Sequence, residues 1–249
     1  MQKSGKQLNV YVMIFIFLLL PFTDITKPFQ GVMLQAAKGE DDLYQIQQLS
    51  NADLLQQLIV VPKQVNDMHS LVEMVQRINK IDRPILQLLV AQGVKVRLFE
   101  GNLTDEPLLY YLKWHKPRGW TSDVTWEDVP GSGGNWLVSA KIGASSAGNG
   151  HGSLNLELHE IGHTVYNLLM TSSNYANEFS QVWNEDVHSL FPNNDYFHHY
   201  PSEYFAEAFA YYYFDEDSSE FIQKNANVTY EFFNSLNELN INEIEHNYY

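Results

Sequence analysis

Residues 159–163 read H-E-I-G-H, and this motif restricts the fold of the chain more than any other feature. Residues four apart lie on the same face of a helix, so His159 and His163 can bind one zinc ion together. Glu160 then lies beside that ion as a candidate general base. The alternative is an ordinary amphipathic helix that carries two surface histidines.

An apolar stripe around the motif favours a packed helix. Its members recur at steps of four and three residues, as they do on the buried side of a helix: Leu154, Leu158, Ile161, Val165 and Leu168. At about 100° per residue, the two histidines fall nearly opposite this stripe. Gly162 lowers helix propensity. It either lets another backbone approach closely or is a tolerated defect.

The composition permits a folded enzyme and excludes several kinds of site. Of 249 residues, 45% are hydrophobic and 18% are charged, which suits a globular protein. Cysteine is absent, which excludes a thiol protease, a disulfide framework and a cysteine-ligated metal. The net charge of −15 repels nucleic acid and anionic lipid, so we expect no nucleic-acid partner.

The first residues resemble a secretion signal. Lys3 and Lys6 precede an apolar run at 8–22, which is short for a transmembrane helix. We therefore expect a secreted, extracellular protein without stable membrane association after signal cleavage. We assign residues 1–37 to the signal and its adjoining segment and 38–249 to a single domain. The cleavage position stays open, and an uncleaved anchor is the alternative.

Hydrophobic periodicity predicts mixed α and β structure. Residues 94–99 alternate apolar and basic side chains, as a half-buried strand does, and 116–134 should be loop. We also expect strands at 58–61 and 136–142. Besides the motif helix, we expect helices at 67–80, 84–93, 177–190, 201–214 and 228–239.

A catalytic zinc needs a third protein ligand, and the helix that starts at Pro201 is the best source of one. Glu203 and Glu207 lie four apart, opposite the apolar stripe of this helix. Glu203 is the candidate ligand, and Glu207 is the candidate partner of a metal-binding histidine. Spacing alone also permits an ordinary acidic first turn, which the helix dipole favours.

Six segments, in order along the chain, carry a resemblance to a known family. They are LIVVPK (58–63), GNLTDE (101–106), PRGW (117–120), TWEDVPGSGG (125–134), NLELHEIGH (155–163) and YPSEYFAEAFAYYY (200–213). Over roughly 43–214 the chain resembles the secreted Pro-Pro endopeptidases and, more distantly, the catalytic domain of anthrax lethal factor. The resemblance implies an α+β zincin-like metallopeptidase domain with a small helix-and-strand N-terminal portion and a mostly helical C-terminal half.

The resemblance also assigns roles in the reaction. It makes His159, His163 and Glu203 the ligands of one zinc ion and Glu160 the catalytic base. The family has a tyrosine seven residues before the glutamate ligand, and Tyr196 stands there. Its phenol would stabilise the oxyanion opposite the metal.

The expected substrate groove follows from the same resemblance. Trp126 matches the family tryptophan that lies against substrate proline rings. Gly133 and Gly134 lead into an expected edge strand that starts at Trp136, along which an extended peptide could pair. Trp136 is also a candidate wall of the groove.

This chain departs from the family pattern near that groove. Ser202 replaces an acid before the glutamate ligand, and Val124 replaces a lysine. The segment after the glycines is one residue longer, and Asn135 and Trp136 replace smaller residues. Asn135, Trp136 and Ser202 are therefore candidate substrate-binding residues, and the expected proline specificity depends on them.

These features predict a secreted zinc endopeptidase that cleaves Pro-Pro bonds in extended proline-rich segments of surface or secreted proteins. A broader-specificity secreted metalloprotease or toxin-like effector is one alternative. A module that binds proline-rich peptides without turnover is another. A pure binder has no use for Glu160, which argues against the last class.

Overall fold

A computed structural model describes residues 11, 13, 29–37, 41–117 and 123–245 of the chain. The apolar run at 8–22, apart from Tyr11 and Met13, lies outside these residues, so the expected secretion signal is not described. Among the described residues, no helix combines the length and the hydropathy that crossing a membrane requires.

A mixed five-stranded sheet forms one side of the molecule, in the order β1-β2-β3-β5-β4. Its strands are β1 (Val32–Met33), β2 (Ile59–Val61), β3 (Lys95–Phe99), β4 (Gly131–Ser132) and β5 (Leu137–Lys141). The three central strands are parallel, and β1 and β4 pair antiparallel at the two edges. Strand β4 is therefore an edge of the sheet, and it contacts the helix that carries the H-E-I-G-H motif.

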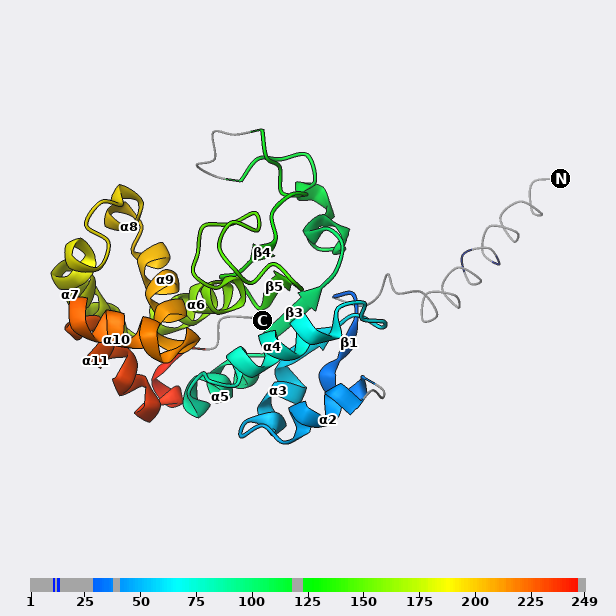
Figure 1. The fold of residues 1–249 in the computed structure, drawn as a ribbon, viewed down its shortest axis with the longest axis horizontal. Coiled ribbons are helices and arrows are strands. Elements are labelled where there is room, and N and C mark those ends of the chain that lie inside the picture. Colours follow the sequence, from blue (N-terminus) through cyan, green and yellow to red (C-terminus); the bar gives the residue numbers. More distant parts are fainter. Residues whose placement is uncertain (1–10, 12, 14–28, 38–40, 118–122, 246–249) are drawn as a thin grey trace.

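The N-terminal helices pack beside this sheet (Figure 1). They are α2 (Asp41–Gln47), α3 (Ala52–Leu58), α4 (Met68–Ile78) and α5 (Arg83–Ala91). Asp67 caps α4 by accepting a hydrogen bond from Ser70 N, and Pro84 occupies the first turn of α5, where its missing N–H costs nothing. Together, α4 and α5 connect the parallel strands β2 and β3, as a crossover must.

The C-terminal half is helical and gathers on the other side of the molecule (Figure 1). It contains α6 (Leu156–Leu169), α7 (Ser173–Leu190), α8 (Asp195–His199), α9 (Pro201–Phe214), α10 (Glu216–Asn225) and α11 (Asn227–Ser235). Short 3₁₀ turns are η3 (Leu34–Ala36), η4 (Leu103–Asp105), η5 (Tyr110–Leu112), η6 (Leu236–Glu238) and η7 (Ile241–Glu243). Phe205 of α9 makes edge-to-face ring contacts with Phe179 of α7 and Phe233 of α11.

The motif helix α6 and helix α9 cross at very short range. A Cβ atom added to Gly162 would lie 2.9 Å from Ala206 Cα, which is closer than carbon atoms pack. The interpretation of Gly162 as a site of close backbone approach is therefore confirmed. This crossing places the motif of α6 directly against the first turns of α9.

Most predicted elements are present within two residues of their expected ends. Helix α9 differs from its prediction in how much of its surface is buried. Tyr204 and Ala206 are as fully buried as Phe205 and Phe209, so α9 is covered on nearly all sides. The apolar stripe that the sequence suggested is only part of its buried surface. The periodic pattern failed because α9 lies between other helices instead of on the surface.

The prediction for β3 was wrong in one respect: the strand is buried, not half-buried. Arg97 is 5% exposed because its Nε lies 2.6 Å from Glu106 Oε2, and Glu106 is completely buried. Glu106 also accepts a hydrogen bond from Gln30 N at 3.0 Å. The alternation of apolar and basic residues predicted that Arg97 faces solvent, but its ion pair with Glu106 lets it be buried.

Residues just before position 37 pack with the rest of the fold. Strand β1 pairs with β2, with Val32 opposite Val61, and Leu34 belongs to the hydrophobic core. The segment from 32 to 36 therefore lies within the domain. The expected boundary at residue 37, with its cleavage position left open, stays a prediction.

Candidate active site

Helix α6 begins at a defined cap and carries three candidate site residues on one face. The Asn155 side chain accepts a hydrogen bond from Leu158 N and so fixes the start of the helix. Two residues later, Glu157 is fully buried and paired with Arg77 of α4 at 2.6 Å. These contacts fix α6 against the N-terminal half, and His159, Glu160 and His163 line the cavity beyond it.

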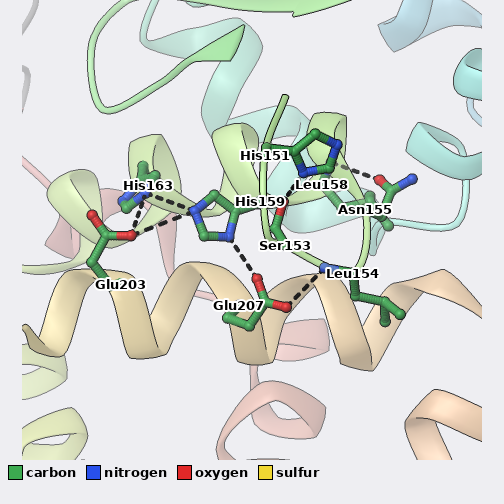
Figure 2. Close-up of polar contacts among 9 residues, drawn as sticks. All are labelled: His151, Ser153, Leu154, Asn155, Leu158, His159, His163, Glu203 and Glu207. Atoms are coloured by element: carbon green, nitrogen blue, oxygen red, sulfur yellow. Dashed lines mark hydrogen bonds and ion pairs between the residues drawn. The ribbon is translucent and has the colours of Figure 1, made fainter. Parts of the chain in front are cut away.

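His159, His163 and Glu203 converge on one point (Figure 2). Glu203 Oε2 lies 3.6 Å from His159 Nε2 and 3.5 Å from His163 Nε2, and the two Nε2 atoms are 3.1 Å apart. Ligands about 2.1 Å from a tetrahedral zinc ion are roughly 3.3 Å from one another. Two imidazole nitrogens and one carboxylate oxygen at these separations fit a single metal ion.

Glu207 orients His159 from below (Figure 2). One of its carboxylate oxygens lies 2.9 Å from His159 Nδ1, and the other accepts a hydrogen bond from Leu154 N at 2.8 Å. A carboxylate at Nδ1 places the ring proton there, which leaves Nε2 as the electron-pair donor. Glu207 is 5% exposed, so this contact is shielded from solvent.

The cluster of carboxylates favours positive charge at its centre. Burial works to lower the pKa of His159, but hydrogen bonds to Glu203 and Glu207 outweigh it and raise the pKa to about 10. For Glu203, burial acts to raise the pKa, and the two histidines more than reverse this and hold it well below its usual range. A site that attracts a proton this strongly also attracts a metal cation.

Glu160 and Tyr196 line the same cavity. Burial raises the pKa of Glu160, although the neighbouring histidines partly oppose the change. A raised value makes a carboxylate a better proton acceptor. Burial, with the charge of Glu203, raises the pKa of Tyr196 well above its usual range, so its phenol keeps its proton and can donate it in a hydrogen bond.

The cavity has a volume of about 730 Å³ and joins the two halves of the molecule. Of the expected groove residues, the structure brings five to it: Trp126, Gly133, Gly134, Asn135 and Ser202. Trp136 and Val124 are not among its lining residues. Trp136 immediately precedes β5, and its carbonyl accepts a hydrogen bond from Lys95 N of the neighbouring strand. The structure does not bring Trp136 to this cavity, and its role as a groove wall stays a prediction.

The edge strand beside the cavity is β4, not the strand after Trp136. Strand β5 lies between β3 and β4, and β4 pairs with it through Gly131 opposite Ala140. The expected loop at 116–134 thus contains a two-residue strand. Its Gly-Ser-Gly-Gly sequence reads as a loop because glycine is depleted in strands.

Several lining residues had no assigned role in the sequence. Pro117, Pro130 and Phe197 add apolar surface to the cavity, and His151 and Asn167 add polar groups. Asn167 follows His163 by four residues, so helical spacing could have placed it on the same face. The others lie in loops or in α8, where no periodicity indicates direction.

Comparisons with known proteins agree with this arrangement. The chain matches the family described as anthrax toxin lethal factor, N- and C-terminal domain, over residues 45–236. It is 38% identical over 187 residues to a Pro-Pro endopeptidase of Clostridioides difficile (strain 630), covering 75% of this chain and 84% of that protein. It is also 38% identical over 184 residues to the Pro-Pro endopeptidase of Paenibacillus alvei, covering 74% and 84%.

A solved structure of the Paenibacillus alvei enzyme has the same fold. The two structures superpose with a TM-score of 0.68 at 38% sequence identity, over 74% of this chain and 99% of that one. The expected α+β metallopeptidase fold is therefore confirmed. By sequence and by structure, the chain belongs to the Pro-Pro endopeptidase family, within the larger family of the lethal factor domain.

Proposed function

We propose that the chain is a zinc-dependent endopeptidase that hydrolyses Pro-Pro bonds in extended, proline-rich segments. The observation that carries the proposal is the meeting of His159, His163 and Glu203 in one cavity with Glu160 and Tyr196. This is a complete set for peptide hydrolysis: ligands, a base and an oxyanion donor. The preference for Pro-Pro bonds is proposed because both relatives are named Pro-Pro endopeptidases.

A single zinc ion suits the three ligands, because zinc accepts imidazole nitrogen and carboxylate oxygen and leaves a fourth position open in catalytic sites. When bound, zinc polarises a carbonyl and makes a coordinated water a good nucleophile near neutral pH. Glu207 serves the ligand set by holding the ring of His159 in one orientation and one tautomer.

Glu160 and Tyr196 supply the groups that move or hold protons. Glu160 accepts a proton from the attacking water and delivers it to the leaving nitrogen. The nitrogen must gain this proton to leave as an amine, which for proline is a secondary amine. Tyr196 donates its phenol proton in a hydrogen bond to the oxygen on which negative charge develops.

The shape of the cavity supports an extended substrate. An incoming peptide can add to the open side of β4, while Trp126 and Pro130 offer flat apolar surface for proline rings. A polyproline segment is already extended, so it loses little entropy on docking. Asn135 and Ser202 also line the cavity and are the residues we propose to tune the preferred flanking residues.

We further propose that the protein acts outside the cell on surface or secreted proteins. The support is the basic start and the apolar run at 8–22, together with the absence of cysteine, which suits an enzyme that needs no disulfide.

The test is a matched set of peptides that differ only at the cut bond: Pro-Pro, Ala-Pro, Pro-Ala and Ala-Ala. The zinc-loaded protein should cleave Pro-Pro much faster than Ala-Ala, and Glu160→Gln should keep its metal and cleave none of them. Equal cleavage of all four would replace the proposal with a broader-specificity metalloprotease. Binding of the Pro-Pro peptide without cleavage by the unmodified protein would indicate a non-catalytic module.

A further inference from the structure

The helix turn that follows Glu160 and His163 in α6 presents two more polar residues on the same face. Thr164 follows Glu160 by four residues, and Asn167 follows His163 by four, so both lie on the same side of the helix. Thr164 is completely buried. A buried hydroxyl needs hydrogen-bond partners, and its partners identify what this turn holds.

Those partners all belong to the loop that joins β4 to β5. Gly134 N donates a hydrogen bond to Thr164 Oγ1 at 3.0 Å, and Thr164 Oγ1 donates to Asn135 O at 3.1 Å. Asn167 Nδ2 donates to Gly134 O at 2.7 Å. One helix turn therefore binds three consecutive peptide groups of a loop that lines the cavity.

The same loop touches the helix backbone itself. A Cβ atom added to Gly133 would overlap the carbonyl oxygen of Glu160, so the loop rests on the backbone of the motif. Gly134 has a φ of +83°, which favours glycine at the turn that follows. The loop is thus pressed against α6 at Gly133 and fastened to it at Gly134 and Asn135.

We propose that Thr164 is a positioning residue, which, with Asn167, sets the depth and register of the substrate-binding wall relative to Glu160. The inference rests on the proposed function, because the wall is taken to bind the peptide backbone. Since β4 directly precedes the fastened loop, a shift of the loop shifts the strand along which substrate pairs. The helix that supplies two of the three metal ligands and the base then also fixes where the cut bond lies.

Thr164→Val tests this because it keeps the volume and removes only the hydroxyl. The change removes the hydrogen bonds that Thr164 makes with Gly134 N and Asn135 O, so the loop should loosen. Hydrogen–deuterium exchange at the Gly134 amide should become at least about tenfold faster, which corresponds to the loss of one hydrogen bond. KM for the Pro-Pro peptide should rise about tenfold with kcat within about threefold, because wall contacts are made before and during the reaction.

Three variants keep the result interpretable. Thr164→Ser retains the hydroxyl and should restore both the exchange rate and KM. Thr104→Val is the matched control, because Thr104 is 2% exposed and its hydroxyl has no hydrogen-bond partner among the described residues, so its KM should not change. Asn167→Ala removes the outer bond and should cause a smaller shift in the same direction, since Asn167 is exposed.

The two hypotheses fail in different ways. If Thr164→Val leaves Gly134 exchange and KM unchanged, the positioning role is wrong even though the protein cleaves Pro-Pro. If the variant only loses kcat in proportion to its folded fraction, Thr164 is merely structural and the proposal is likewise overturned. If the unmodified protein neither binds nor cleaves the peptide, the proposed function fails, and exchange at Gly134 still decides whether Thr164 fastens the loop.

Discussion

Glu203 joins the two helices of the site, because it belongs to α9 and its carboxylate faces two histidines of α6. Glu203→Ala should reduce bound zinc from near one ion per chain to less than about a tenth, since three protein ligands are needed to hold a catalytic zinc. Metal analysis of the purified protein after dialysis measures this. Glu178→Ala, at an exposed carboxylate of α7, is the control and should retain its zinc. Full zinc content in Glu203→Ala would show that another group completes the site.

Zinc binding should depend on pH through His159. Its pKa is raised from 6.5 to about 10 in the metal-free chain, and a metal ligand must lose that proton. The apparent zinc affinity should therefore rise by up to about tenfold per pH unit from pH 7 toward 10. Competition against a chelator of known affinity, at several pH values, measures it. An affinity that stays flat across this range would contradict the raised pKa.

The stability of the metal-free protein should follow the opposite direction. A raised pKa means that the folded chain holds the His159 proton more tightly than the unfolded chain does. This contribution is complete below about pH 6.5 and is lost as pH rises through about 10. The melting temperature of chelator-treated protein should therefore fall over that interval. The fall should cover the same pH range as the rise in zinc affinity, because both depend on the His159 proton.

Tyr196 should matter for turnover more than for binding. Tyr196→Phe removes one donor to the oxyanion and should lower kcat by roughly 10- to 1000-fold with little change in KM. Tyr200→Phe is the matched control, because the Tyr200 ring lies 5.0 Å from that of Tyr196 but does not line the cavity. Steady-state kinetics on one Pro-Pro peptide compares them. An unchanged kcat in Tyr196→Phe would make this tyrosine a packing residue.

Single residues differ in how well the sequence placed them. His159 and His163 could be placed by helical spacing, because a helix fixes direction over four residues. Tyr196 could not, since α8 is a five-residue helix whose orientation depends on its neighbours, and only the family resemblance indicated it. The strand after Trp136 was wrongly expected at the edge of the sheet, because the pairing of β4 with β5 carries no local signal.

At the scale of elements, the crossing of α6 and α9 is the contact on which the site depends. Gly162→Ala would improve helix propensity by about 1 kcal/mol but forces a methyl group against Ala206. Overpacking of this kind costs about 1–3 kcal/mol, so a net loss of stability is expected. Urea unfolding measures it. Gly152→Ala is the control, since an added Cβ there meets nothing within 4 Å. Equal or greater stability in Gly162→Ala would mean that the two helices can separate at no cost.

The sequence predicted elements well where one period dominates and poorly elsewhere. Helix α4, for example, lies within two residues of the expected 67–80. The burial of Arg97 in β3 depends on Glu106, a partner outside the strand, which no local pattern contains. Strand β4 depends on pairing with β5, and α10 is polar enough to read as loop. The elements missed are those that tertiary contacts define.

For the whole molecule, the segment before residue 37 should contribute to stability. A chain that starts at residue 38 loses β1, the core side chain Leu34 and the hydrogen bond from Gln30 N to Glu106. Burying one leucine contributes about 1.5–3 kcal/mol to stability, and buried Glu106 also loses the hydrogen bond that it accepts from Gln30 N. This chain should melt well below one that starts at residue 29. Differential scanning calorimetry compares the two, and identical melting temperatures would return the boundary to residue 37.

The overall architecture could be predicted from the sequence, but the arrangement around the cavity could not. The order of strands and helices follows from periodicity, and the family resemblance adds the fold. The cavity forms where the β4–β5 loop, α6, α8 and α9 meet, and this meeting depends on side-chain contacts between distant segments, such as those of Thr164 with Gly134 and Asn135. Contacts of this kind carry no signature in a single sequence.

Strand β4 is only two residues long, and its brevity bears on which proteins the cavity spares. A short edge offers an arbitrary extended chain few backbone hydrogen bonds, so most polypeptides gain too little on docking to offset the ordering that docking demands. A stiff proline segment demands less ordering and fills apolar walls. On the proposed function, other proteins, including other copies of this chain, would escape cleavage because the short edge offers them few hydrogen bonds.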